Sequence, residues 1–259
     1  MIWHVFYTFP GKMRFFLFAI VLATGFNTAA QDTKIKTDRP GETQNAELTN
    51  KGFFQVETGF TKEQHKEDET TVYHPEALLR YGLSDRVEIR STVPFVTQKN
   101  PYQKNTGLQP IQFGFKLKIL ENKGAIPLTS LLTDFGIPTL ASEAFKADKV
   151  FPVVRLLFIN AISEKIKLAY NIGSEWDGFS STPQWIYSFS PELEVGDKWE
   201  FFIELFGQIK KGEHPQHHFD GGLAYFISSN IKWDIYAGTG ISPHAMDYII
   251  SSGISFQLK

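Results

Sequence analysis

The chain of 259 residues contains no cysteine. A disulfide scaffold is therefore excluded, and zinc fingers and iron–sulfur clusters lack their thiolate ligands. A surplus of one charge is also missing, since 26 Lys and Arg stand against 28 Asp and Glu, a net charge of −2. Proteins that bind nucleic-acid backbones usually carry a positive surplus, so we expect no nucleic-acid partner.

Long apolar runs are missing as well. No stretch approaches the about 18 consecutive apolar residues that would indicate a transmembrane helix. Aromatic residues, in contrast, make up 15% of the chain and hydrophobic residues 42%. This composition excludes a disordered or collagen-like chain. The protein must either bury a large core or present its aromatic side chains to lipid.

Residues 1–30 differ in composition from the rest of the chain. Their only charged side chains, Lys12 and Arg14, precede an apolar run and then small residues up to Ala30. This order is typical of a secretory signal peptide that is cleaved after Ala30, and the apolar run is too short to span about 30 Å of hydrocarbon. Met13 offers a second possible start of translation. We therefore predict a signal peptide and export through the inner membrane.

From residue 52 onward the hydropathy pattern has a period of two, which predicts β-strands. Phe54, Val56 and Phe60 alternate with Gln55 and Glu57. Ordinary strands have about 5–6 residues, whereas a strand that crosses a bilayer obliquely needs about 9–11. Strand length therefore favours a membrane barrel. The clearest alternating segments are 54–60, 87–95, 111–119, 166–172, 185–195, 199–205, 231–237 and 248–258, with less regular ones near 71–81, 125–138, 149–160 and 217–227.

The connections between these segments alternate in length. Short turns are expected at 82–85, 121–124, 163–164, 196–198 and 228–230, and longer or more polar loops at 62–70, 99–108, 139–148, 176–183, 210–217 and 242–246. Outer-membrane barrels have short turns in the periplasm and longer loops outside. We therefore predict an all-β fold, an antiparallel transmembrane β-barrel of about twelve strands over residues 52–259.

Charged side chains fall on the face opposite the apolar stripe. In a barrel this face lines the lumen, where acids and bases can pair across strands and partly fill it. His74, Glu76 and Arg80 occupy alternate positions that place them on the same face as Glu88 and Arg90, which follow the turn at 82–85. This arrangement indicates a solute-selecting constriction or a charge-paired wall. The predicted lumen-lining residues are Glu57, His74, Glu76, Arg80, Glu88, Arg90, Lys116, Arg155, Glu192 and Glu204.

Four tryptophans bear on the choice between a membrane barrel and a soluble protein. Trp176, Trp185, Trp199 and Trp233 lie at or near segment ends on the apolar stripe. A membrane interface favours amphipathic rings at such positions, so the barrel is preferred. In the alternative, a secreted soluble β-sandwich that binds ligands, the same rings would pack in the core.

Three stretches carry a family resemblance: TDRPGETQ over 37–44, KGFFQVETGF over 51–60 and LLRYGLSDRVEIR over 78–90. They resemble the transporter family named for the MetA pathway of phenol degradation, and the resemblance covers roughly 37–258. It implies an outer-membrane barrel that passes small, hydrophobic or aromatic solutes, and it supplies no catalytic residue. The expected partners are outer-membrane lipid, the barrel-assembly machinery and a small-molecule solute, and no cofactor is expected.

Two further candidate sites are weaker. His214, His217 and His218 cluster near Asp220, but the two adjacent histidines would point to opposite sides of a strand, so we expect a solvated loop and no metal site. An outer-membrane enzyme that acts on lipids is the other alternative. No G-x-S-x-G motif occurs, and we expect no enzymatic activity.

Residues 31–51 precede the first strand. Pro40 and Gly41 predict a turn within them. This segment could plug the lumen or hang in the periplasm, and Arg39 and Glu42 could pair with lumen charges. The spacing of its residues does not distinguish between the two positions.

Overall fold

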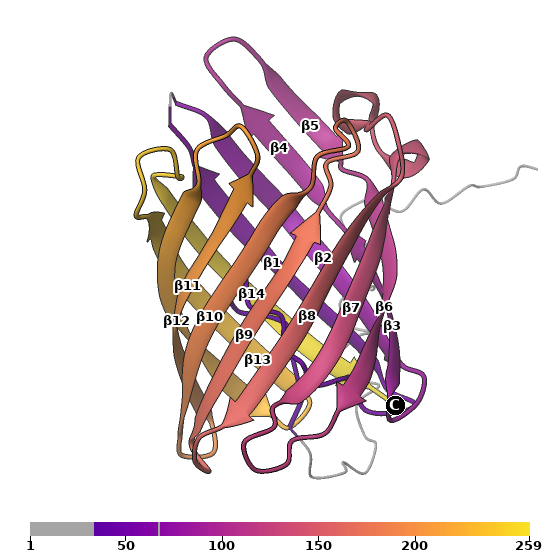
Figure 1. Ribbon diagram of the computed structural model, residues 1–259, viewed down its shortest axis with the longest axis vertical. Coiled ribbons are helices and arrows are strands. Elements are labelled where there is room, and N and C mark those ends of the chain that lie inside the picture. The colour runs from indigo at the N-terminus through magenta and orange to yellow at the C-terminus, as the bar shows by residue number, and fades with distance from the viewer. Residues whose placement is uncertain (1–33, 67) are drawn as a thin grey trace, which may run out of the picture. The chain divides into compact units, whose positions relative to one another are not determined.

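The computed structural model describes residues 34–66 and 68–259, so the predicted signal peptide lies outside the described residues. One antiparallel sheet closes on itself, because β1 pairs with both β2 and β14 (Figure 1). A sandwich would need two packed sheets, so the β-sandwich alternative is wrong. The strands are β1 (Phe54–Gln64), β2 (Thr70–Gly82), β3 (Val87–Val93), β4 (Phe95–Lys99), β5 (Lys104–Leu108), β6 (Ile111–Leu120), β7 (Leu128–Ile137), β8 (Phe151–Ala161), β9 (Ile166–Glu175), β10 (Gln184–Val195), β11 (Trp199–Lys210), β12 (Gln216–Ser228), β13 (Ile231–Gly240) and β14 (Tyr248–Leu258).

These segments make up twelve barrel strands, as predicted. β3 and β4 are one strand interrupted at Pro94, since both pair with β2. β5 and β6 continue each other on the neighbouring strand and are interrupted near Pro110. Proline cannot donate to the sheet ladder, which accounts for both interruptions. The predicted loop over 99–108 is therefore partly wrong, because Lys104–Leu108 forms β5.

The two faces of the wall have opposite polarity. Phe54 and Phe60 of β1 are 40% and 60% exposed, whereas Gln55 and Glu57 between them are at most 1% exposed. Apolar side chains thus point outward and charged side chains lie buried inside, as expected for strands between lipid and a lumen. Two of the four predicted tryptophans, Trp185 and Trp199, are exposed near the starts of β10 and β11, whereas Trp176 and Trp233 are partly buried.

The two ends of the barrel differ in their connections. At one end, which we call the turn end, the chain reverses within a few residues, as between Val195 and Trp199. At the other, the loop end, the β7–β8 connection carries two short 3₁₀ helices, Pro138–Leu140 and Glu143–Phe145. No helix within residues 34–66 and 68–259 is long and apolar enough to cross a membrane.

Residues 34–53, which we call the inner segment, contact the inside of the wall. Near the turn end, the Ile35 amide donates to the Ser229 carbonyl at 2.7 Å. Farther along, the fully buried Ala46 packs against Leu132 and Leu157 of the wall. The segment can be followed in indigo ahead of β1 in Figure 1. The structure therefore brings this non-strand part of the chain among the charged inner side chains.

Candidate functional site

The centre of the site is the carboxylate of Asp38 in the inner segment. It lies 2.7 Å from Arg90, 2.8 Å from Lys116 and 3.7 Å from Arg80, which come from β3, β6 and β2. All four side chains are buried. Burial alone would raise the pKa of Asp38, but the three cations outweigh it and hold that pKa well below its usual range. Asp38 is therefore ionised and joins the inner segment to three strands.

Two more carboxylates complete this network. Arg80 donates to Glu57 at 2.6 Å and to Glu88 at 2.9 and 2.8 Å. Glu57 also accepts the backbone amide of Asp38 at 2.9 Å, and Glu88 accepts that of Thr49 at 2.7 Å. Charges in such a buried site are tolerated only when they are paired and hydrogen-bonded, and each acid here meets a cation. The inner segment thus supplies, through Asp38, a negative charge that helps to neutralise the cationic side chains of the wall.

A second anchor lies on β13 and β14, on the other side of β1 from β2 and β3. Arg39 donates to Asp234 of β13 through two nitrogens, at 2.9 and 3.3 Å, and to Ser251 at 2.9 Å. Gly59 and Gly253 provide the room, since a Cβ atom on either would lie within 2.7 Å of the guanidinium. The two-nitrogen geometry holds the arginine in one orientation.

The turn of the inner segment is held by Glu204 of β11. Its carboxylate accepts the hydroxyl of Thr43 and, at 2.8 Å, the backbone amide of Glu42. Thr43 also contacts the Ser188 hydroxyl at 2.8 Å. Gly41 has φ +87°, and a Cβ atom there would lie 2.6 Å from a Glu204 oxygen. Only glycine suits both the backbone conformation and the close approach.

The structure places most of the predicted lumen residues on the inner face. Seven of them contact the inner segment directly, and Glu76 and Glu192 line internal cavities. Arg155 lies 3.6 Å from Glu175 and donates to the Glu42 carbonyl at 3.4 Å. The other six contacting residues are Glu57, Arg80, Glu88, Arg90, Lys116 and Glu204.

His74 lies elsewhere, on the outer face beside the exposed Phe95, with 6.3 Å between ring centroids. The β1–β2 register shifts here, so that Phe60 alone opposes both His74 and Pro75. Such a bulge changes which alternate residues face inward beyond it. Tyr73 therefore lines the interior in place of His74. The prediction that His74 faces the lumen assumed strict alternation along the strand, and this bulge interrupts the alternation.

Several inner residues were not among the predicted site residues. Lys232 and Asp234 on β13 alternate with Trp233 and Ile235, so their period-two pattern could have identified them. Asp38 could not have been found in this way, because it precedes the first strand. His217 and His218 do point to opposite sides of β12: His217 contacts Tyr187, whereas His218 is buried. Among the described residues, no group of three or more His, Asp or Glu side chains is placed to hold a metal ion.

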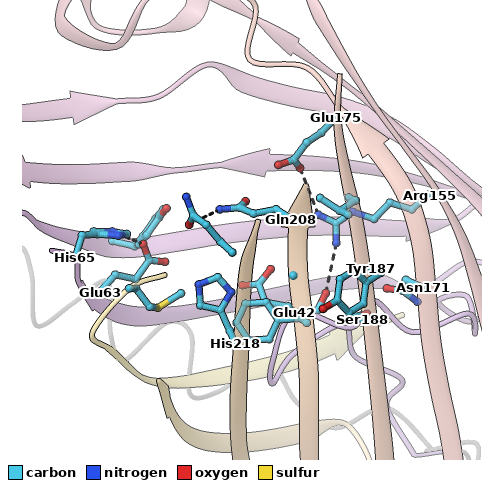
Figure 2. Close-up of a pocket in the computed structure, with 16 residues that line it drawn as sticks. Glu42, Glu63, His65, Arg155, Asn171, Glu175, Tyr187, Ser188, Gln208 and His218 are labelled. Atoms are coloured by element: carbon cyan, nitrogen blue, oxygen red, sulfur yellow. Dashed lines mark hydrogen bonds and ion pairs between the residues drawn. The ribbon is translucent and has the colours of Figure 1, made fainter. Parts of the chain in front are cut away.

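Cavities lie on both sides of the inner segment. Two loop-side cavities of about 270 and 250 Å³ share Glu42, Glu63 and Tyr73. Figure 2 shows the larger of the two. A third of about 410 Å³ is lined by strand residues such as Glu192 and Lys232, together with the beginning of the inner segment. The inner segment therefore separates internal spaces that the barrel wall encloses.

Comparison with solved structures identifies the type of barrel. The COG4313 outer membrane channel from Pseudomonas putida F1 is 11% identical, with a TM-score of 0.65 over 85% of this chain and 99% of that chain. The KdgM porin is 12% identical, with a TM-score of 0.53 over 78% and 99%. The translocator domain of autotransporter NalP from Neisseria meningitidis is 10% identical, with a TM-score of 0.51 over 95% and 94%. The fold is thus that of an outer-membrane channel.

Comparison with curated proteins finds none that matches this sequence. A protein family, in contrast, matches almost the whole barrel together with most of the inner segment. Its description is "Putative MetA-pathway of phenol degradation", and the match covers residues 37–258. The three stretches over 37–44, 51–60 and 78–90 that carried the resemblance fall within it or begin it. The chain therefore belongs to this family, and it is an outer-membrane β-barrel.

Proposed function

We propose that the protein is an outer-membrane channel for small solutes whose pore is closed at rest by the inner segment. The observation that carries this proposal is the contact of Asp38 with three cationic side chains from three strands. A twelve-stranded barrel is already narrower than porins of 16–18 strands, which leave a water channel. A segment fixed across such a lumen blocks it until these contacts break.

The proposed orientation follows from the connections. Outer-membrane barrels place short turns in the periplasm and longer loops outside. The loop-side cavities then receive solute from the exterior, and the cavity near Glu192 and Lys232 opens toward the periplasm. The signal peptide proposed for residues 1–30 directs the chain across the inner membrane to reach this location.

The proposed solutes are small molecules with a hydrophobic or aromatic body. The family description, which refers to phenol degradation, supports this class. The loop-side cavity combines Phe206 and Met246 with polar groups such as Asn171 and Gln208. An aromatic ring with one polar substituent fits such a mixed lining better than a wholly apolar molecule, which would leave the polar groups unpaired.

The first experiment is folding of residues 31–259 in detergent, with gel migration compared before and after boiling. A shift on boiling is expected of a folded barrel. Conductance in planar bilayers and swelling of liposomes in phenol are then compared between the wild type and Asp38→Asn. We expect low conductance for the wild type and a clear increase for the variant. If the variant folds but stays closed to ions and to phenol, the channel proposal is wrong.

The comparisons also bear on the enzyme alternative. The similar structures named above are a channel, a porin and a translocator domain, which favours transport over lipid chemistry. A lipid-acting enzyme needs a nucleophile with a base in hydrogen-bond reach. We expect no release of fatty acid from phospholipid vesicles that contain the folded protein, and release above the protein-free rate would reopen this alternative.

A further inference from the structure

The loop-side cavities contain more carboxylates than cations. Their two guanidinium groups already have acidic partners, since Arg39 pairs with Asp234 at 2.9 Å and Arg155 lies 3.6 Å from Glu175. Asp38 and Glu57, which also line this space, belong to the network with Arg80. Three lining carboxylates have no Lys or Arg partner among the described residues, namely Glu42, Glu63 and Glu76.

A buried histidine gives an independent sign of a missing ligand. His218 is 3% exposed and lines the larger loop-side cavity, and neither of its ring nitrogens has a hydrogen-bond partner. Its ring stacks on Phe206 at 4.7 Å between centroids, which fixes its orientation. Figure 2 shows His218, Glu42 and Glu63 around the same space. A buried polar group without a partner is costly, so a ligand that donates a hydrogen bond would stabilise it.

Aromatic rings complete the lining. Tyr73 borders both cavities, and Tyr236 borders the smaller one. The face of an aromatic ring attracts a nearby cation, most strongly where water is excluded. The space of about 270 Å³ in the larger cavity exceeds what a bare ion needs. Together with the lack of a three-ligand metal cluster among the described residues, these features favour an organic cation over a metal ion.

We propose that the loop-side cavities bind a small organic ammonium ion with an aromatic or alkyl body. The ammonium group donates hydrogen bonds to His218 and to two of the three carboxylates of Glu42, Glu63 and Glu76, and the third carboxylate adds its negative charge. The body lies against Tyr73. This inference deepens the proposed function by naming the charge of the solute. It rests on that function only for the passage of the solute through the barrel, because binding can be measured while the channel is closed.

The protonation of Glu42 supports the same site. Burial raises its pKa to about 7, with Glu204, Glu63 and Glu76 adding to the rise and Arg155 opposing it. A bound cation stabilises the ionised form, so binding takes a proton off Glu42 and strengthens as pH rises through this range. His65 faces the same space, and its hydrogen bond to Glu63, at 3.2 Å, raises the pKa of the imidazole.

The test uses three probes of similar size, namely 2-phenylethylammonium, 2-phenylethanol and 3-phenylpropionate, titrated calorimetrically into residues 31–259 folded in detergent. We expect binding of the cation at least about tenfold tighter than that of the neutral or anionic probe. Glu42→Gln and Glu76→Gln should each weaken cation binding about tenfold. Glu192→Gln, which changes a half-buried carboxylate in the separate cavity that Lys232 also lines, should leave it unchanged. The gel shift on boiling confirms that each variant folds.

Two results would overturn the inference. One is equal affinity, or no measurable affinity, for all three probes. The other is cation binding that Glu42→Gln and Glu76→Gln leave intact. Conductance of Asp38→Asn is recorded on the same preparations, so that the two proposals separate. A conducting variant without cation binding defeats only the ligand proposal, and cation binding to a barrel that never conducts defeats only the channel proposal.

Discussion

The carboxylate of Asp38 lies 2.7 Å from the guanidinium of Arg90, although the two residues are 52 positions apart in the chain. Asp38 stands before the first strand, whereas Arg90 is in the wall of the barrel. Removal of one partner of a buried ion pair leaves the other charge uncompensated, which costs about 3–5 kcal/mol. The position of the inner segment therefore depends on a carboxylate that serves three cations.

Asp38→Asn is expected to release the inner segment, because the amide cannot neutralise Arg80, Arg90 and Lys116. The loss should be about 3–5 kcal/mol of segment docking, seen as increased conductance and as faster tryptic cleavage within the segment. Asp197→Asn in the exposed β10–β11 turn is the matched control and should change neither measurement. Unchanged cleavage in a folded Asp38→Asn barrel would contradict this expectation.

Mild acid should not open the channel by protonating Asp38. A carboxyl whose pKa is lowered by folding contributes stability that is fully present above its unfolded pKa and is lost only as pH falls through the folded value. The unfolded value is near 3.8, and the folded one is lower. Conductance attributable to segment release should thus stay constant from about pH 7 to about pH 5. A rise in that range that Asp38→Asn abolishes would show that the Asp38 contacts are weaker than the structure indicates.

A disulfide should lock the segment in place. The hydroxyl oxygens of Thr43 and Ser188 lie 2.8 Å apart, so their side chains are close enough for Thr43→Cys and Ser188→Cys to cross-link. The natural chain has no cysteine to interfere. Combined with Asp38→Asn, the oxidised pair should restore low conductance, and a reducing agent should reverse this. Each single cysteine serves as the control, and conductance insensitive to reduction in the cross-linked protein would argue against gating by this segment.

The backbone at Gly41 gives a second route to release. Its φ of +87° disfavours any side chain, and a Cβ atom would press on Glu204. Gly41→Ala should weaken segment docking by at least about 1–2 kcal/mol, measured as increased conductance. Gly124→Ala is matched in strain, with φ +61°, but no atom lies within 4 Å of its Cβ position. That variant should conduct like the wild type. Equal conductance of Gly41→Ala and Gly124→Ala would show that contact with Glu204 does not cause the effect at Gly41.

Cation binding should tighten with pH. With a pKa of about 7, Glu42 gains most of its charge between about pH 6 and about pH 8, so the Kd for 2-phenylethylammonium should fall about tenfold over this range. In Glu42→Gln the Kd should be nearly constant. Calorimetric titrations at the two pH values measure both. A pH dependence that persists in the variant would assign the titration to another group, such as His65.

The alternation of Phe54, Gln55, Val56 and Glu57 was sufficient to predict which side chains face lipid and which face the interior. The reason is local: successive residues of a strand point to opposite faces, and lipid and lumen demand opposite polarity. Strand number and the alternation of turns with loops follow from the same pattern. Both therefore could be derived without knowledge of any distant contact.

The tertiary structure decided what this pattern does not record. His74 lies outside because a bulge opposite Phe60 shifts the parity of β2, and hydropathy does not reveal an extra residue. Asp38 has no periodic signal, and its partners Arg90 and Lys116 come close only when the barrel closes around the inner segment. Local periodicity thus determined the wall of this protein, whereas the contents of its lumen depend on pairings between residues far apart in the chain.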